Sequence, residues 1–507
     1  MSSSFNLTER AWIKTNSGER SLRELFAAGG EIKALSGDPV EKISTLKLAL
    51  AIAQSALRGQ LKNNDDWQAL SLSKLSAQVL TYLDKYGQEF DLYGEHPFLQ
   101  IKKLKEIAKN PGKTPGTFQV EISTGNTTVF TQSQRERPLN DAEKARLLIS
   151  QMSFALSGKK TDHTMVLSPG YEKGKSACSG PAVGMYGALH CFYKGENFLE
   201  TVRYNLLTDE DLQALNIYPE GLGYAPWERM PQGEDDEIAR VLRGSYIGRL
   251  VSMCRFCLYD SETLLVTEGI RPLTVKEKVF DPSVTTFVTK KEELSLIYCD
   301  PEYRPWRQLT SLLSFMDEKR REGCRQLALP SKRVFKEGRA VKVWTGGLRI
   351  TFQSGEQYAA GKDDYVESEF TIPPEFYASL AYGALCREME VLDGINKVLY
   401  ASVREYYEKQ KVQMPKKSSS PSRPRAATRE FWLKCERYAD ELTDCVCSES
   451  EESQQRIAEL RVKFTSFARE IFDRTCQQTT ARQIAAWAEA RPHLSKFLRQ
   501  DGQAKNG

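Results

Sequence analysis

The chain has 507 residues, of which 40% are hydrophobic and 27% charged, and 71 lysines and arginines against 67 aspartates and glutamates give a net charge of +4. This composition is typical of a globular protein of two to four domains, and it excludes a membrane span and, with eleven scattered cysteines, a disulfide framework. The net charge alone does not indicate a nucleic-acid-binding protein, so the distribution of charge matters more.

The first part of the chain is predicted to be rich in helices. Its N-terminal stretch, MSSSFNLTERAW, lacks the basic and then apolar layout of a signal peptide, which predicts a cytoplasmic protein. Asp38 and Pro39 begin a predicted long helix whose apolar face includes Val40, Ile43 and Leu46. A second helix leads to an aromatic cluster and then to the motif Glu95-His96-Pro97-Phe98-Leu99-Gln100.

Two loops follow. The segment 125–137, GNTTVFTQSQRER, is predicted to be an exposed loop with one aromatic residue, Phe130. Residues 168–181, SPGYEKGKSACSGP, contain three glycines and two prolines, which is typical of a loop that approaches something closely or of a flexible connector. The segment is not a Walker A motif, because Pro169 occupies the position of the first glycine.

Strands are predicted to dominate from Tyr246 to about Leu313, with Lys276-Glu277-Lys278 between two of them. This region contains the only close CxxC pair, Cys254 and Cys257. A structural zinc site normally needs two such pairs, so we predict no metal here. No nucleophile elbow or HExxH motif occurs, and we therefore expect a binding protein that is not an enzyme.

A basic stretch runs from Asp317 to Arg349. It contains four acidic residues and ten basic ones, which are Lys319, Arg320, Arg321, Arg325, Lys332, Arg333, Lys336, Arg339, Lys342 and Arg349. Such a stretch is either a solvated face or a surface for phosphate groups, and the sequence leaves both interpretations open.

The stretch Gly346 to Ser368, GGLRITFQSGEQYAAGKDDYVES, predicts a hairpin. After two glycines, apolar residues alternate with polar ones up to Phe352, as in a half-buried strand. Residues 353–356 and 361–364 supply turns, and residues 365–370 a return strand. A hairpin of this kind holds one or two side chains on a stiff, narrow tip, although an ordinary surface hairpin has the same pattern.

From about Pro374 the pattern changes to helices alone. Four amphipathic helices are predicted at 375–411, 429–447, 451–476 and 480–499, with a flexible linker rich in proline, serine and basic residues at 414–428. We therefore expect an α+β fold in which a large mixed domain, residues 1–373, is followed by a four-helix bundle, residues 374–507.

Several of these landmarks occur in an order that resembles the CasA family, the large subunits of the type I-E CRISPR surveillance complex, Cascade. They are Ala11-Trp12-Ile13, the motif at 95–100, Ser168-Pro169-Gly170, Lys276-Glu277-Lys278, Gly346-Gly347, Gly355-Glu356-Gln357 and the terminal helices. The resemblance spans nearly the whole chain. It implies an RNA-guided antiviral complex in which guide pairing reads the target while a protein subunit reads a short flanking motif, the PAM.

The resemblance also implies roles for particular residues. Gln357 matches the family's glutamine wedge, which is inserted beside a base step and starts the R-loop. Gln353 is the second candidate because it lies nearer to the glycine pair, and the implied wedge also includes Glu356 and Tyr358. Glu356 departs from the small polar residue that the family has beside the wedge.

Further implied contacts concern the PAM and the guide RNA. Lys278 matches the lysine that reaches the PAM minor groove, where the acceptor pattern is nearly degenerate. Phe130 matches an aromatic residue that grips the 5′ handle of the guide RNA. The family's glycine loop begins at Gly170 and is followed here by Tyr171, Glu172 and Lys173, where the family can have more glycine.

The implied partners are guide RNA, double-stranded target DNA, other Cascade subunits and a helicase-nuclease recruited after R-loop formation, with no membrane and no cofactor. Some members of the family hold zinc with two CxxC pairs, but residues 147–153 occupy the region of the second pair here, so the metal is not carried over. Two other classes stay open: a metal-dependent nucleic-acid enzyme using Cys254 and Cys257, and a scaffold that binds only proteins through its helices.

Overall fold

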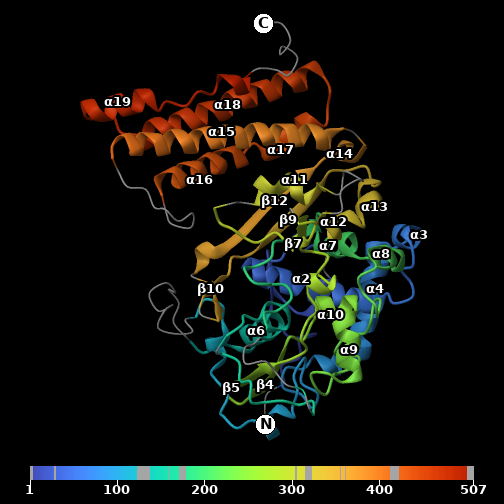
Figure 1. The fold of residues 1–507 in the computed structure, drawn as a ribbon. Helices are drawn as coiled ribbons and strands as arrows, with labels where there is room; N and C mark the ends of the chain where they lie inside the picture. The colour runs from blue at the N-terminus through green and yellow to red at the C-terminus, as the bar shows by residue number, and fades with distance from the viewer. Residues whose placement is uncertain are drawn as a thin grey trace. The chain divides into compact units, whose positions relative to one another are not determined.

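The computed structural model describes residues 4–27, 30–122, 137–158, 160–169, 171, 178–289, 291–302, 305–314, 322–353, 355–359, 361–378, 380–411 and 422–498. The chain forms two compact units. The first comprises residues 1–301, 319–337 and 343–367, and the second comprises 302–318, 338–342 and 368–507. Both helices and strands are present (Figure 1), which confirms the expected α+β class.

Helix α2 (Pro39–Ala56) is buried on almost all sides in the first unit. It begins where the sequence predicts, because the side chain of Asp38 accepts a hydrogen bond from the backbone N–H of Glu41 and Pro39 occupies the first turn. The predicted apolar face covers only part of the helix surface that is buried in the structure. Lys47 and Gln54 are buried as well, Lys47 in an ion pair with Asp281 and Gln54 in a hydrogen bond to a backbone carbonyl.

The other helices of the first unit are mostly short. The longest are α4 (Leu72–Tyr86), which Ser71 caps, and α6 (Asp141–Phe154), which begins with a capping box of Asn140 and Glu143. The rest are α1 (Leu22–Ala27), α3 (Asn64–Gln68), α5 (Leu104–Ile107), α7 (Phe198–Asn205), α8 (Asp209–Leu215), α9 (Glu237–Gly244), α10 (Tyr246–Leu250), α12 (Arg325–Ala328) and α13 (Ser331–Phe335).

The strands form small sheets. Antiparallel pairs join β1 (Ile13–Thr15) to β2 (Gly18–Arg20), β4 (Arg255–Asp260) to β5 (Thr263–Glu268), and β10 (Thr351–Gln353) to β11 (Glu356–Tyr358). Two three-stranded sheets have the orders β7 (Leu294–Leu296), β6 (Thr285–Val288), β8 (Gly323–Cys324) and β12 (Tyr365–Ile372), β9 (Val341–Leu348), β3 (His190–Lys194).

The second unit is dominated by helices (Figure 1), namely α11 (Leu309–Leu312), α14 (Glu375–Ala378), α15 (Ala381–Lys409), α16 (Arg423–Glu436), α17 (Ala439–Val446), α18 (Glu451–Thr475) and α19 (Ala481–Glu489). Its last continuous segment begins at residue 368. The predicted helix at 429–447 is divided into α16 and α17, so the described residues after 380 contain five helices where the sequence predicted four.

The prediction of a flexible linker at 414–428 is wrong for residues 423–428, which are helical. Helix α16 begins at Arg423, and Pro424 lies in its first turn, where a missing backbone N–H costs no hydrogen bond. Ala427 and Phe431 are then buried on one face of the helix. The remainder of the predicted linker, 414–421, lies outside the described residues.

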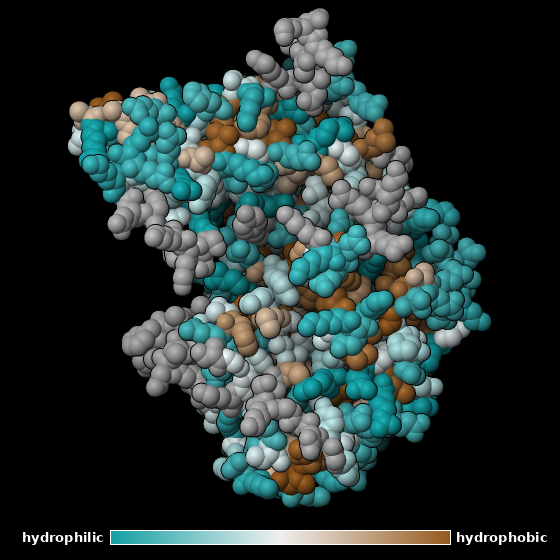
Figure 2. Space-filling view, viewed as in Figure 1, coloured by the Kyte–Doolittle hydropathy of each residue, from teal (hydrophilic) through white to brown (hydrophobic). Residues whose placement is uncertain are grey.

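Hydrophilic side chains predominate on the face shown in Figure 2, and exposed apolar side chains lie there in small groups. None of the described helices combines the length and apolarity needed to cross a membrane.

Candidate nucleic-acid interface

The β10–β11 hairpin, with β10 labelled in Figure 1, is shorter than predicted and has a sharper tip. Gln353 pairs with Glu356, so two residues connect the strands, and Gly355 has a φ of +81°. A positive φ is typical of the tight turns that match the twist of a hairpin. Two side chains on β10 point into solvent: Phe352 is 41% exposed, and Gln353 is exposed directly before the turn.

The glycine pair lies inside strand β9 and does not open the hairpin. A Cβ at Gly347 would lie 2.6 Å from the Sγ of Cys299 and 2.7 Å from the carbonyl oxygen of Ala188. A Cβ at Gly346 would lie 2.8 Å from the carbonyl oxygen of Val366. These glycines therefore allow close packing of β9 against its neighbours.

Gln357, the first wedge candidate, is 1% exposed, so its amide does not reach the surface of the hairpin in this structure. Its side-chain oxygen accepts a hydrogen bond from the backbone N–H of Ser157 (2.9 Å), and its side-chain nitrogen donates to the carbonyls of Gly184 (2.8 Å) and Met185 (2.9 Å). An amide held by three internal bonds cannot be inserted between bases without losing them. Gln357 instead anchors the hairpin to the body of the first unit.

The other implied wedge residues differ in exposure. Glu356 is buried, and its side chain packs against Gly158. Tyr358 is half-buried and donates a hydrogen bond from its hydroxyl to the side-chain oxygen of Gln353 (3.3 Å). Among the four implied wedge residues, Gln353 is therefore the one whose amide lies at the exposed tip.

The segment 184–187, which is not among the predicted site residues, is fixed beside this hairpin. Besides the two bonds from Gln357, the backbone N–H of Ile350 donates to the carbonyl of Tyr186 (3.0 Å). Met185 and Tyr186 are nevertheless exposed, by 48% and 45%. The only signal in the sequence is the pair of glycines, 184 and 187, that flank two large side chains.

Lys278 lies at the end of a short 3-10 helix, Val275–Glu277, that a capping box of Thr274 and Glu277 begins. Its φ of +62° is in the left-handed region, which is uncommon for a residue with a side chain. The side chain is exposed, and no ion pair to it occurs among the described residues. Val275 packs against a buried cluster that includes Val284 and Leu296, so this lysine projects from a supported turn.

The predicted glycine loop is described only in part. Gly170, Glu172 and Lys173 lie outside the described residues, as does Phe130. Tyr171 is half-buried, and its pKa is raised by burial and by the charge of Glu268.

The start of this loop is held by Glu234. Its carboxylate accepts hydrogen bonds from the backbone N–H groups of Leu167 (3.1 Å) and Ser168 (2.7 Å). Glu234 is itself buried, so the chain entering the loop has a fixed position.

The basic stretch is used in more than one way. Arg333 is buried, forms an ion pair with Asp211 and donates to the carbonyl of Leu206 (2.8 Å). Its charge is therefore neutralised inside the protein. Lys332 is exposed on α13, and Lys336 is exposed directly after the helix. Residues 319–321 lie outside the described part of the chain. The stretch is therefore not one continuous phosphate-facing surface.

The motif at 95–100 has a structural explanation. Phe98 is buried between Phe90 and Trp227, with ring centroids 4.7 and 5.8 Å away. Gln100 is buried, donates to the carbonyl of Leu92 (2.8 Å) and accepts from the backbone N–H of Tyr259 (2.7 Å). The motif thus ties the turn to strand β4.

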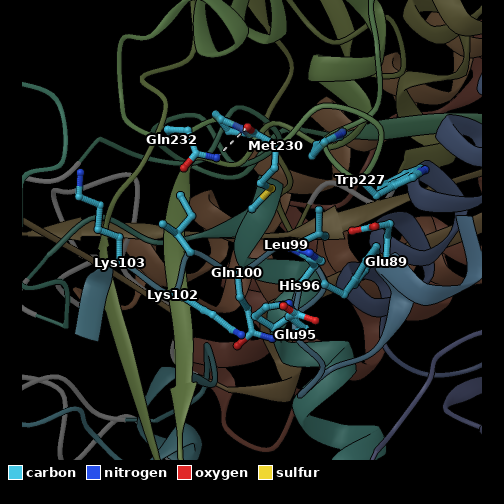
Figure 3. Close-up of a pocket in the computed structure, with 15 residues that line it drawn as sticks. Glu89, Glu95, His96, Leu99, Gln100, Lys102, Lys103, Trp227, Met230 and Gln232 are labelled. Carbon is cyan, nitrogen blue, oxygen red and sulfur yellow. Dashed lines mark hydrogen bonds between the residues drawn. The ribbon is translucent and has the colours of Figure 1, made fainter. Parts of the chain in front are cut away.

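The polar residues of this motif line a cavity of about 210 Å³. Glu95 and His96 are exposed at its edge, and Figure 3 shows Met230 and Gln232 on the side opposite Glu95. Leu99, also in the lining, has a φ of +54°.

Cys254 and Cys257 are both buried at the start of β4. Burial raises the pKa of Cys254 and raises that of Cys257 to about 12, which favours the thiol over the thiolate that binds metals. Within the described ranges, no group of three or more histidine, cysteine, aspartate or glutamate residues is arranged to hold a metal ion.

Comparisons with solved structures show the fold. The chain superimposes on CasA from Thermus thermophilus with a TM-score of 0.71 and 18% identity, covering 97% of this chain and 99% of that one. Cse1 from Thermobifida fusca gives a TM-score of 0.71 and 19% identity, covering 98% and 97%. A chain of a CRISPR RNA-guided surveillance complex gives 0.67 and 15%, covering 98% and 100%.

No curated protein matches the sequence significantly. The profile of the CRISPR-associated protein Cse1 matches residues 6–475, which is most of the chain. This match confirms the resemblance found in the sequence, and the chain belongs to the Cse1 family, whose members are also called CasA.

Proposed function

We propose that this protein is the large subunit of a type I-E surveillance complex, in which it reads the PAM in double-stranded DNA and opens the duplex to start the R-loop. Membership of the Cse1 family supports the general role. The single observation that carries the site assignment is the exposed amide of Gln353 at the tip of an anchored two-residue hairpin.

Gln353 is our candidate for the wedge in place of Gln357. Separating a base step costs on the order of a few kcal/mol, so the wedge residue must be supported rigidly enough that the DNA does not displace it. The internal bonds of Gln357 hold one strand of the hairpin, and Tyr358 steadies the amide of Gln353 across the strands. The buried glutamine thereby stiffens the support of the exposed one.

Lys278 is our candidate for the PAM contact. Its ammonium group lacks an ion-pair partner in the described part of the chain and projects from a turn supported by the core. The minor groove offers similar acceptors for several base pairs, so a lysine there would tolerate more than one PAM.

The test is Gln353→Ala in the reconstituted complex with guide RNA. We expect R-loop formation on linear duplex to slow by about tenfold, which corresponds to an activation free energy of strand opening that is higher by about 1.4 kcal/mol. Assembly should be unchanged, and a target already mismatched beside the PAM should restore the parental rate. R-loop formation is followed by probing the displaced strand with permanganate. Gln60→Ala, an exposed glutamine elsewhere in the first unit, is the matched control.

Equal rates for Gln353→Ala and the parent complex would exclude Gln353 as the wedge. The alternative classes have tests of their own. Stoichiometric zinc together with cleavage of naked DNA would favour a metal-dependent enzyme using Cys254 and Cys257. Purification with protein partners but without guide RNA would favour a scaffold.

A further inference from the structure

We propose that Met185 and Tyr186, here called the 185–186 shelf, receive the base that is displaced when the target duplex opens beside Gln353. The inference rests on the proposed function and adds a second DNA contact to the same site. Its ligand is an unpaired nucleobase of the target DNA, bound by stacking.

The shelf is attached directly to the hairpin. The carbonyls of Met185 and Tyr186 accept hydrogen bonds from the side chain of Gln357 (2.9 Å) and the backbone N–H of Ile350 (3.0 Å). Gln353 follows Ile350 by three residues, which is roughly 10 Å at about 3.3 Å per residue of strand. A base that leaves the stack beside Gln353 therefore has the shelf within the reach of one or two nucleotides.

The backbone of the shelf is held rigidly. Gly184 and Gly187 both have positive φ values, +58° and +85°. A Cβ at Gly187 would lie 1.7 Å from the carbonyl oxygen of Leu348, so only glycine allows the loop to lie this close to β9. The N–H groups of Gly187 and Ala188 both donate to the carbonyl of Val183 (2.9 and 3.0 Å).

The side chains on this rigid loop are large, apolar and exposed. Single exposed apolar residues are common on proteins and need no function. Here two adjacent ones are presented by a loop whose backbone is fixed on both sides. The ring of Tyr186 is supported by Tyr298, with centroids 5.4 Å apart and planes at 87°, yet nearly half of the side chain remains accessible.

Stacking suits this position chemically. Every base has a π-face, so an aromatic side chain binds a displaced base with little regard to its identity. The sequence of the target is set by the guide RNA, and a receptor for the first displaced base must accept any of the four. Tyr298 also packs against the core cluster that supports Val275, three residues before Lys278, so the shelf shares a supporting core with the proposed PAM contact.

The first measurement uses the reconstituted complex and linear target duplex. Tyr186→Ala should slow R-loop formation about 5- to 150-fold, the loss expected when one stacked base is released. Tyr186→Phe keeps the aromatic ring and should stay within about twofold of the parent rate. Tyr186→Leu keeps the packing on Tyr298 without a π-face and should behave like the alanine variant. Tyr400→Ala, a comparably exposed tyrosine on α15, is the matched control.

The second measurement does not depend on any variant. A target carrying 5-iododeoxyuridine at the first displaced positions is irradiated in the parent complex, and the crosslinked peptide is identified. We expect the crosslink at Tyr186 or Met185. A crosslink confined to other peptides would overturn the proposal.

The outcomes separate this inference from the proposed function. If Gln353→Ala slows opening while Tyr186→Ala matches the parent, the shelf is wrong and the wedge stands. If neither variant changes opening, the wedge assignment fails as well. If Tyr186→Ala remains folded but no longer assembles with the other subunits, the shelf is a protein-docking surface and the proposal is wrong.

Discussion

A network of buried polar residues connects Lys47 to the carbonyl of Ala182, three residues before Met185 of the 185–186 shelf. Lys47 pairs with Asp281, and the Ser283 hydroxyl lies 2.7 Å from a carboxylate oxygen of Asp281 and 2.8 Å from Nδ1 of His190, so it can donate to either of them. The other ring nitrogen of His190 lies 2.9 Å from the carbonyl oxygen of Ala182. Burial opposes the charge on Asp281, but Lys47, His190 and Ser283 outweigh it and hold the pKa of the carboxyl well below its usual value.

His190 should make stability depend on pH. Burial and the charge of Lys47 lower its pKa to about 4, although Asp281 opposes the shift, whereas the unfolded chain has a value of about 6.5. Between these values the unfolded state binds a proton that the folded state does not, so stability falls as the pH is lowered. The full effect is about 3 kcal/mol.

Replacement of His190 tests this expectation. His190→Gln keeps an acceptor for the Ser283 hydroxyl and a donor for the Ala182 carbonyl but cannot titrate. The unfolding free energy of the variant should therefore change less between pH 6.5 and 4 than that of the parent protein. Urea denaturation across that range measures the slope, with His96→Gln at an exposed position as the control. A slope equal to that of the parent would show that another group is responsible.

At the level of elements, α15 and α18 are joined by a buried ion pair. Arg461 donates from Nε to a carboxylate oxygen of Glu388 (2.9 Å), and each side chain is 10% exposed. Removing one partner of such a pair leaves the other charged and buried, which typically costs about 3–5 kcal/mol. Replacing both with apolar residues avoids that penalty.

We expect the single variants Glu388→Met and Arg461→Met to destabilise the helices of the second unit by about 3 kcal/mol, and the double variant to recover much of the loss. Thermal unfolding of the full chain, followed by far-UV circular dichroism, measures the effect. Arg404→Ala breaks the exposed pair with Glu408 on α15 and should leave the transition unchanged. Equal losses in the single and double variants would mean that the pair is not coupled.

For the molecule as a whole, the net charge of +4 conceals an uneven distribution. Arg333 neutralises a buried acid, whereas Lys278 remains exposed without an ion-pair partner in the described residues. The contribution of each basic residue to DNA binding therefore depends on whether the fold has already used its charge. Composition alone cannot supply that information.

Lys278→Ala should weaken capture of PAM-containing duplex by the complex. One lost cation should also reduce the slope of log K against log salt by about 1. Binding titrations at several salt concentrations measure both effects. Lys74→Ala removes an exposed lysine on α4 and is the control. An unchanged slope for Lys278→Ala would count against a DNA contact.

The sequence by itself was sufficient for the family, the α+β class, the long helices and the position of the hairpin. These features depend on local signals: apolar periodicity, caps such as Asp38, and turn residues such as Gly355. The start of α16 was missed because its proline- and serine-rich composition outweighed the helix-starting position of Pro424.

Only the tertiary structure shows which of the two glutamines is exposed. Gln353 and Gln357 have the same residue type and lie on either side of one turn, and the register, in which Gln353 pairs with Glu356 and Phe352 with Gln357, places them on opposite faces of the hairpin. Gln357 is buried because Ser157, Gly184 and Met185 surround it, and those residues are more than 170 positions away in the sequence. Burial is set by such distant segments, which no local pattern contains.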